Sequence, residues 1–246
     1  MPVWVQAGLW GTLAGGALVV GALIAWFVSV PRSVVASVMA FGAGVLISAL
    51  AFDLVAEAES RGGLVPTLSG FLGGAAVYVL TNVALAAKGA RHRKRSQDQQ
   101  PSEGEQSGSG TAIAVGALLD GVPESIVLGL TLLTGQGIGL PVLAAVFISN
   151  LPEGLSSAAG MKRAGRGATY VFGVWGGIAL ASGIAGALGV LVLDGASPAL
   201  VATITAVAAG AILAMVADTM IPEAFERTHL YAGLIRHYRV RTRLHP

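Results

Sequence analysis

Long apolar stretches alternate with short polar connections along this chain of 246 residues. A helix needs about 20 mostly apolar residues to cross the hydrocarbon core of a bilayer. Seven stretches reach that length, and they predict an all-α, polytopic membrane protein with seven transmembrane helices. The expected spans are Ala7–Ser29, Val34–Ala56, Leu64–Ala87, Thr111–Thr134, Gly139–Gly160, Thr169–Leu193 and Ala199–Met220.

Composition supports this class and removes several kinds of chemistry. Hydrophobic residues make up 54% of the chain and charged residues 11%, whereas soluble domains carry about 25% charged residues. The chain has no cysteine, which excludes disulfides, thiolate metal ligands and cysteine nucleophiles. No basic residue precedes the first apolar stretch, which exceeds the roughly 7–15 residues of a signal-peptide core, so we expect it to be a span.

The basic residues predict an orientation. If the seven stretches cross in alternation, every Lys and Arg except Arg61 falls on one side of the membrane. Basic residues in short loops mark the cytoplasmic face. We therefore expect a protein of the plasma (cytoplasmic) membrane with its N-terminus outside and a basic tail, residues 226–246, in the cytoplasm.

One long polar stretch divides the chain. Residues 91–110 read "RHRKRSQDQQPSEGEQSGSG" and have no apolar periodicity, which is typical of a flexible cytoplasmic loop. The loop would separate three spans in residues 1–90 from four spans in residues 111–225. We expect its basic run, "RHRKR", to mark topology and contact the anionic surface of the lipid bilayer instead of binding nucleic acid.

Two related phrases place a Pro-Glu pair inside apolar spans: "DGVPES" in the fourth and "SNLPEG" in the fifth. Asp120 and Glu124 stand four residues apart. Asn150 and Glu153 stand three apart, with Ser149 one place earlier, so each set lies on one helix face. A proline cannot donate to the carbonyl four residues back, so we expect each helix to kink and expose a carbonyl oxygen.

Further acids lie within other spans, Asp53 in the second and Asp218 in the seventh, and the spans contain no Lys, Arg or His. An acid at the centre of a span costs about 2.5–3.5 kcal/mol. Without a basic partner, each acid must be protonated, face water or bind a cation. Carboxylates, an amide, a hydroxyl and free carbonyls on adjacent broken helices favour a cation site. The alternative is that the prolines serve packing and the acids bond to neighbouring Ser or Asn.

These motifs resemble those of the ZIP (Zrt/Irt-like) divalent metal transporters. "DGVPES" and "SNLPEG" are similar to motifs of that family's fourth and fifth helices, "FGAGVLISALAFDLVAEA" to its second and "AGAILAMVADTMIPEAFE" to its seventh. The resemblance implies uptake of zinc, iron, manganese or a similar divalent cation into the cytoplasm, no prosthetic group, and a homodimer. The metal ligands it implies are Asp120, Glu124, Ser149, Asn150 and Glu153, with Asp53 and Asp218 along the route through the membrane.

The chain also departs from the family. Asp120 stands where a His is expected, and Ser149 occupies the first position of the fifth-helix motif. Oxygen ligands shift a site toward harder cations such as Mn²⁺, although Zn²⁺ still binds oxygen well. The family usually has an eighth span. "THLYAGLI" resembles its start, but the arginines that follow oppose insertion into the membrane.

Two other functions stay open. A non-transporting metal sensor or degenerate paralogue would explain the missing histidines and the missing eighth span. An intramembrane aspartyl protease could use two of the buried acids, but such enzymes carry Tyr-Asp and Gly-x-Gly-Asp motifs, and neither surrounds Asp53 or Asp120. We therefore expect a transporter and not an enzyme.

Overall fold

The fold is seen in a computed structural model that describes residues 1–96, 98–133 and 137–225. Within this part the chain is helical and contains no strand, and seven helices are long and apolar enough to cross a membrane. The expected all-α, seven-span membrane fold is confirmed. The spans are Val3–Phe27, Arg32–Gly62, Leu64–Ala86, Ser109–Leu133, Leu140–Arg163, Ala168–Leu193 and Pro198–Phe225.

Five of these spans are single α-helices, and two are interrupted. The single helices are α1 (Val3–Phe27), α4 (Leu64–Ala86), α5 (Ser109–Leu133), α6 (Leu140–Arg163) and α7 (Ala168–Leu193). In the second span, α2 (Arg32–Ala49) and α3 (Val55–Gly62) are joined by a π-helical turn, Leu50–Leu54. In the seventh, α8 (Pro198–Met215) and α9 (Ile221–Phe225) are joined by another, Val216–Met220.

The two π-helical turns contain the two isolated acids, Asp53 and Asp218. A π-helical turn inserts an extra residue into a helix and frequently marks a functional position. The sequence predicts that both acids lie within spans, but it does not predict the π-helical turns.

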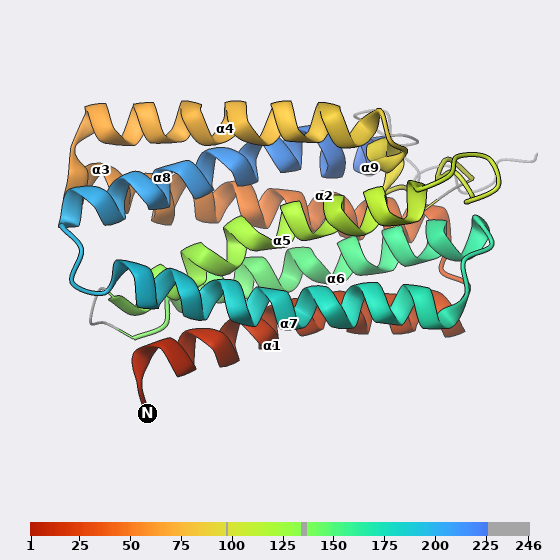
Figure 1. The fold of residues 1–246 in the computed structure, drawn as a ribbon, viewed down its shortest axis with the longest axis horizontal. Coiled ribbons are helices and arrows are strands. Elements are labelled where there is room, and N and C mark those ends of the chain that lie inside the picture. The colour runs from red at the N-terminus through yellow and green to blue at the C-terminus, as the bar shows by residue number, and fades with distance from the viewer. Residues whose placement is uncertain (97, 134–136, 226–246) are drawn as a thin grey trace, which may run out of the picture.

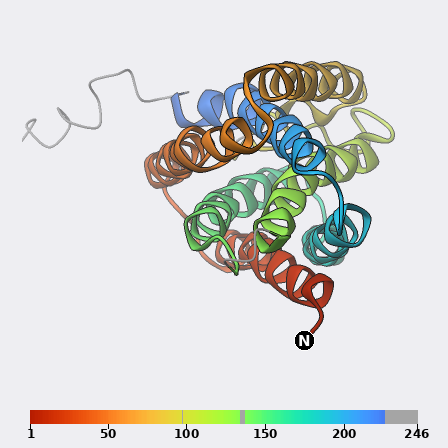
Figure 2. The same ribbon diagram turned by 90° about the vertical axis from the view of Figure 1, so that its left-hand side faces the viewer.

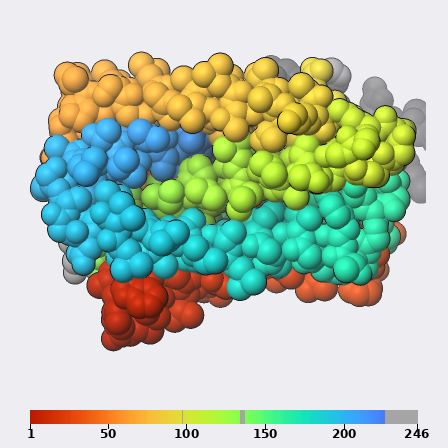
Figure 3. Space-filling model, viewed as in Figure 1, coloured from red at the N-terminus to blue at the C-terminus, as the bar shows by residue number. Residues whose placement is uncertain are grey.

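The helices run side by side, alternating in direction, as Figure 1 shows. α1 packs against α6 and α7, α4 packs along α8, and α5 contacts α7 and α8. Viewed end-on, α4 lies at one edge of the bundle and α1 at the other (Figure 2). In the space-filling view α5 reaches this face as a strip between α4 and α8 on one side and α7 on the other (Figure 3).

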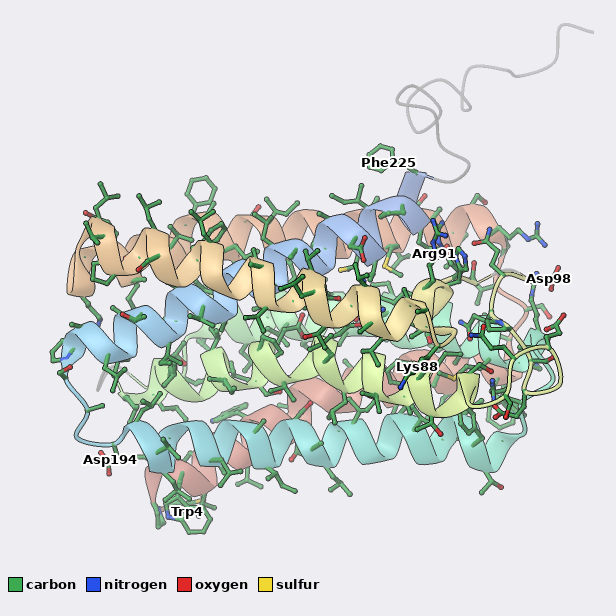
Figure 4. The ribbon with its side chains drawn as sticks, turned by 45° about the horizontal axis from the view of Figure 1, so that its top comes forward. Trp4, Lys88, Arg91, Asp98, Asp194 and Phe225 are labelled. Atoms are coloured by element: carbon green, nitrogen blue, oxygen red, sulfur yellow. The ribbon has the colours of Figure 1, made fainter. Side chains whose placement is uncertain are left out.

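The bundle has two ends that differ in charge. Lys88, Arg91 and Asp98 lie at one end, and Trp4 and Asp194 lie at the other (Figure 4). We call the first the loop end, because residues 87–108 connect α4 to α5 there, and the second the opposite end. Successive connections therefore lie at alternate ends of the bundle. The same alternation was assumed when the basic residues were assigned to one side of the membrane.

Glycine sets the distance between packed helices. A Cβ at Gly154 of α6 would collide with the backbone of Leu18 in α1, and a Cβ at Gly74 of α4 would collide with that of Val207 in α8. Small residues at such crossings let helix backbones approach closely inside a membrane. The Gly154 contact fixes α6, which carries half of the candidate site, against α1.

Candidate cation site

The acids of the two Pro-Glu motifs are buried between the central helices. Asp120 and Glu124 on α5 are 3% and 2% exposed, and Glu153 on α6 is 3% exposed. Both helices continue through Pro123 and Pro152. The spacing of the motifs therefore places three carboxyl groups within the bundle, as the sequence predicts for one face of each helix.

Asp120 has a basic partner, and the expectation that the buried acids have none is wrong. The Nη2 atom of Arg93 lies 2.8 Å from Asp120 Oδ1, and its Nε donates to Oδ2 at 2.9 Å. Arg93 comes from outside the spans: residues 90–96, here called the inserted segment, place Arg93 and Lys94 against α5 and α6. Counting charges within the spans could not find a cation that enters from a loop.

The Arg93 guanidinium is held by several groups at once. It donates to Tyr78 Oη at 2.7 Å and to Asn82 Oδ1 at 2.6 Å, and Tyr78 donates to Asp120 Oδ1 at 2.6 Å. Burial alone would lower the pKa of Arg93, but the adjacent Asp120 carboxylate outweighs it and the pKa is raised. Arg93 is therefore a fixed positive charge, only 1% exposed.

Lys94 lies between the two Pro-Glu helices. Its Nζ is 2.6 Å from Glu153 Oε2 and 3.3 Å from Asp120 Oδ2, and the residue is 4% exposed. A positively charged ammonium thus occupies the place between α5 and α6 where the sequence predicts a bound cation. The polar loop predicted to be flexible contributes two of the most buried charges of the described chain.

The inserted segment is fastened at its far end. Ser96 donates to Glu223 Oε1 from its backbone N at 3.1 Å and from its Oγ at 2.6 Å. Arg95 lies 3.5 Å from Glu223 Oε2, and Ser156 of α6 donates to the Lys94 carbonyl at 2.6 Å. Gln100 donates to the carbonyl of Arg95 at 3.0 Å. These bonds hold the backbone on both sides of Lys94.

Two carboxylate oxygens of the site lack a partner. Glu124 Oε1 and Glu153 Oε1 are buried and accept no hydrogen bond from the described residues. Leaving a buried acceptor unsatisfied costs about 1–3 kcal/mol, more for a charged group, so each such atom calls for an explanation. In the described part of the chain, no three His, Asp or Glu side chains are arranged to hold a metal ion. Lys94 fills the space between Asp120 and Glu153.

The polar neighbours of Glu153 on α6 bond to backbone groups. Ser149 Oγ donates to the carbonyl of Val146 at 3.0 Å, and Asn150 Nδ2 donates to the carbonyl of Ala14 on α1 at 2.9 Å. Both side chains are buried. Their oxygen atoms have lone pairs left for a cation, so their roles as ligands stay predictions.

Asp53 and Asp218 lie on opposite sides of the buried acids. Asp53 lines a cavity of about 680 Å³ at the opposite end, together with Glu57 and Arg61. Asp218 lines a cavity of about 590 Å³ at the loop end, where it accepts a hydrogen bond from Asn82. The structure therefore does not gather Asp53 and Asp218 into one centre with the Pro-Glu acids.

Apolar side chains surround Glu124 in the bundle. A void of about 10 Å³ adjoins Glu124, and the residues that share it are Leu46, Ala49, Leu50, Leu54, Val127, Val142, Ala145, Val146 and Ile212. Val142 also lines the Asp53 cavity, and Lys94 lines the Asp218 cavity. From the opposite end of the bundle to the loop end, the order is Asp53, apolar side chains, the buried acids, Lys94 and Asp218.

Several residues of the site escape sequence reasoning: Tyr78, Asn82, Arg93, Lys94, Ser156 and Glu223. One signal was available. Tyr78 and Asn82 stand four residues apart in the third span, so they share a helix face, and the basic run follows that span closely. A polar stripe ending near a basic run indicates that the run can fold back along the stripe.

Comparison with known proteins gives no family. No family model matches the chain, and no curated protein shows significant similarity to it. The likeness to the ZIP transporters is therefore a likeness of motifs, and the function must be argued from the chemistry of the site.

Proposed function

We propose that this chain is a divalent-cation transporter of the ZIP type, which moves zinc, iron, manganese or a similar cation across the plasma membrane into the cytoplasm. Its site would lie between α5 and α6, at Glu124 and Glu153, with Asp120 beside them. The cation is the substrate, and the transport needs no enzyme chemistry.

One observation carries this proposal: the buried, unpartnered oxygens Glu124 Oε1 and Glu153 Oε1. They lie on the two helices whose motifs resemble the family's metal site. A divalent cation between them would satisfy both oxygens and replace the water that burial removes from them. Ionisable residues within membrane spans commonly mark ion sites.

The surrounding features support a route for the ion. The cavity at Asp53 would receive cations from outside, the apolar side chains around Leu50 and Val146 would close the path, and the Asp218 cavity would release cations inside. Intramembrane acids commonly mark ion pathways. The basic loop end would face the cytoplasm under the positive-inside rule.

The ligand set differs from the one the sequence implies. Both oxygens of Asp120 accept hydrogen bonds from Arg93. Asp120 would therefore supply negative charge to the site more readily than it would bind the cation directly through a lone pair. Glu124 and Glu153 become the main acids, with Asn150 and Ser149 as further oxygen donors. An all-oxygen site favours Mn²⁺ over softer ions, within the limits set by the strong binding of Zn²⁺ to most ligands.

A second candidate is a membrane protein that does not transport. The observation in its favour is the pairing of Asp120 and Glu153 with Arg93 and Lys94, which compensates two buried carboxylates without any metal. The protease alternative gains no such support, because Asp53 lines the opposite-end cavity and Arg93 and Asn82 stand between Asp120 and Asp218.

Transport in proteoliposomes tests the proposal. Purified protein is reconstituted with an indicator dye inside the vesicles, and Mn²⁺ or Zn²⁺ is added outside. We expect saturable uptake that Glu124→Gln and Glu153→Gln abolish, while the control Glu59→Gln, at an exposed position on α3, transports like the parent. Uptake that persists in both site variants would rule out this site, and no uptake by the parent would favour the non-transporting alternative.

A further inference from the structure

Lys94 contacts Glu153, one of the two glutamates between which the transported cation would bind. Its ammonium lies 2.6 Å from Glu153 Oε2 and 3.3 Å from Asp120 Oδ2, between α5 and α6. A divalent cation and the Lys94 ammonium cannot both contact Glu153 at such distances without strong repulsion. We infer that Lys94 is a built-in competitor for the transported cation, whose side chain leaves the Asp120–Glu153 pair for the Asp218 cavity when a divalent cation binds. This inference rests on the proposed function.

Arg93, the neighbouring cation, has a different role. Its guanidinium contacts both oxygens of Asp120 and also Tyr78 and Asn82, and it lines none of the cavities described above. A planar guanidinium with this many donors engaged is held in one geometry. Arg93 is therefore a permanent counter-charge for Asp120, and the exchangeable positive charge is Lys94.

The side chain of Lys94 can move while its backbone stays in place. Arg93 anchors the segment before it, Ser96 and Glu223 anchor it after, and Ser156 holds the Lys94 carbonyl at 2.6 Å. A lysine side chain is a flexible four-carbon stem that carries a compact charge. Rotation about the stem moves the charge without breaking any of these anchors.

A destination for the ammonium adjoins the site. Lys94 already lines the cavity of about 590 Å³ at the loop end, together with Asn82, Asp218 and Thr219. A water molecule occupies about 30 Å³ of liquid, so this cavity has room for an ammonium and its water. Asp218 is exposed in this cavity and offers a carboxylate there. The Lys94 ammonium would move from the Asp120–Glu153 pair to Asp218.

This arrangement explains the state of the site in the structure. With Lys94 in place, its ammonium compensates Asp120 and Glu153. With Lys94 turned toward Asp218, Glu153 regains an oxygen beside the unpartnered Glu124, while Arg93 still compensates Asp120. The lysine thus sets the affinity of the site, and its movement accompanies each binding event.

A binding measurement on matched lysine variants tests the inference. Mn²⁺ and Zn²⁺ are titrated calorimetrically into the full chain in detergent, as the parent, as Lys94→Gln and as Lys88→Gln. Lys88 lies at the loop end and is exposed, so its variant controls for a lost positive charge. We expect Lys94→Gln to bind at least about tenfold more tightly than the parent, a difference of about 1.4 kcal/mol, and Lys88→Gln to bind like the parent.

A measurement on the parent avoids any question of how a variant folds. An amine-acylating reagent modifies exposed lysines, and mass spectrometry reports the rate at Lys94 relative to Lys88 and Lys162. We expect saturating Mn²⁺ to raise the relative rate at Lys94 several-fold, with NaCl at matched ionic strength as the control. A parent that binds Mn²⁺ while Lys94 stays as protected as before would overturn the inference alone.

The outcomes also separate the two proposals. Equal or weaker binding by Lys94→Gln, with binding by the parent, rejects the competitor role and leaves the cation site standing. Absence of Mn²⁺ and Zn²⁺ binding in the parent and in Lys94→Gln rejects the site itself, and the role of Lys94 with it.

Discussion

Removing the Arg93 side chain is the sharpest test of the ion-pair network. Arg93→Met keeps much of the side-chain volume but leaves Asp120 buried without its main partner. In the structure Arg93 donates to Asp120 at 2.8 and 2.9 Å, and Asp120 is 3% exposed. Tyr78 would remain as a hydrogen-bond donor to Asp120, and Lys94 Nζ would remain 3.3 Å from Asp120 Oδ2.

The expected loss of stability follows from the burial of both groups. Breaking a buried ion pair by removing one partner costs about 3–5 kcal/mol, because the other charge stays uncompensated. Replacing both partners by apolar residues is often close to neutral. We therefore expect Arg93→Met to lower the free energy of unfolding by about 3–5 kcal/mol, and Arg93→Met combined with Asp120→Leu to recover more than half of that loss.

Unfolding in mixed micelles measures these differences. The protein in mild detergent is titrated with sodium dodecyl sulfate, and the fluorescence of its four tryptophans follows the loss of structure. Arg91→Met is the matched control, since Arg91 is exposed two residues away. If Arg93→Met unfolds with the same free energy as Arg91→Met, the inserted segment does not hold Asp120 as described.

Two further predictions concern packing and the loop. Gly74→Ala should destabilise the bundle by about 1–3 kcal/mol in the same unfolding assay, because its Cβ would collide with the α8 backbone. Gly73→Ala, where a Cβ meets nothing within 4 Å, should be neutral, so equal effects would contradict the close helix crossing. Hydrogen bonds from the Gly108 backbone and Arg166 lower the pKa of Glu103 from 4.5 to about 2. A carboxyl group whose pKa is lower in the folded state stabilises the fold at pH values above its unfolded-state pKa. That stabilisation is lost as the pH falls toward the folded-state pKa. Amide exchange of residues 98–110, corrected for intrinsic rates, should therefore accelerate as pH falls from 4.5 toward 2, and Glu103→Gln should remove this pH dependence.

The spans were predictable because the bilayer imposes a simple rule. A run of about 20 apolar residues has few alternatives to a transmembrane helix, and the basic connections fix how successive runs alternate. The i,i+4 spacing of Asp120 and Glu124 likewise settles which helix face they share. These properties depend on neighbours along the chain, which a sequence displays directly.

The partners of the acids were not predictable in the same way. Arg93 and Lys94 belong to a segment whose composition is typical of a solvated loop. Their burial follows from contacts with Tyr78, Asp120 and Glu153, which lie on three different helices. Such long-range pairing leaves no periodic signal in the sequence. The local composition therefore predicts that these lysine and arginine side chains are exposed to water.

The same limit applies to the π-helical turns at Asp53 and Asp218. Each inserts one extra residue into an otherwise regular span, and the apolar pattern on either side is that of an ordinary helix. The change shifts the face on which each acid points. Sequence periodicity therefore identifies the acids but not the cavities they line.

The proposed site requires a divalent cation to bind between Glu124 and Glu153. An experimental structure of the protein soaked with Mn²⁺, with anomalous diffraction recorded to locate the metal, tests it most directly. We expect an anomalous peak between the two glutamates, within coordination distance of oxygen, with the Lys94 ammonium moved toward Asp218. A peak elsewhere, or none at saturating Mn²⁺ with Lys94 still against Glu153, would contradict it.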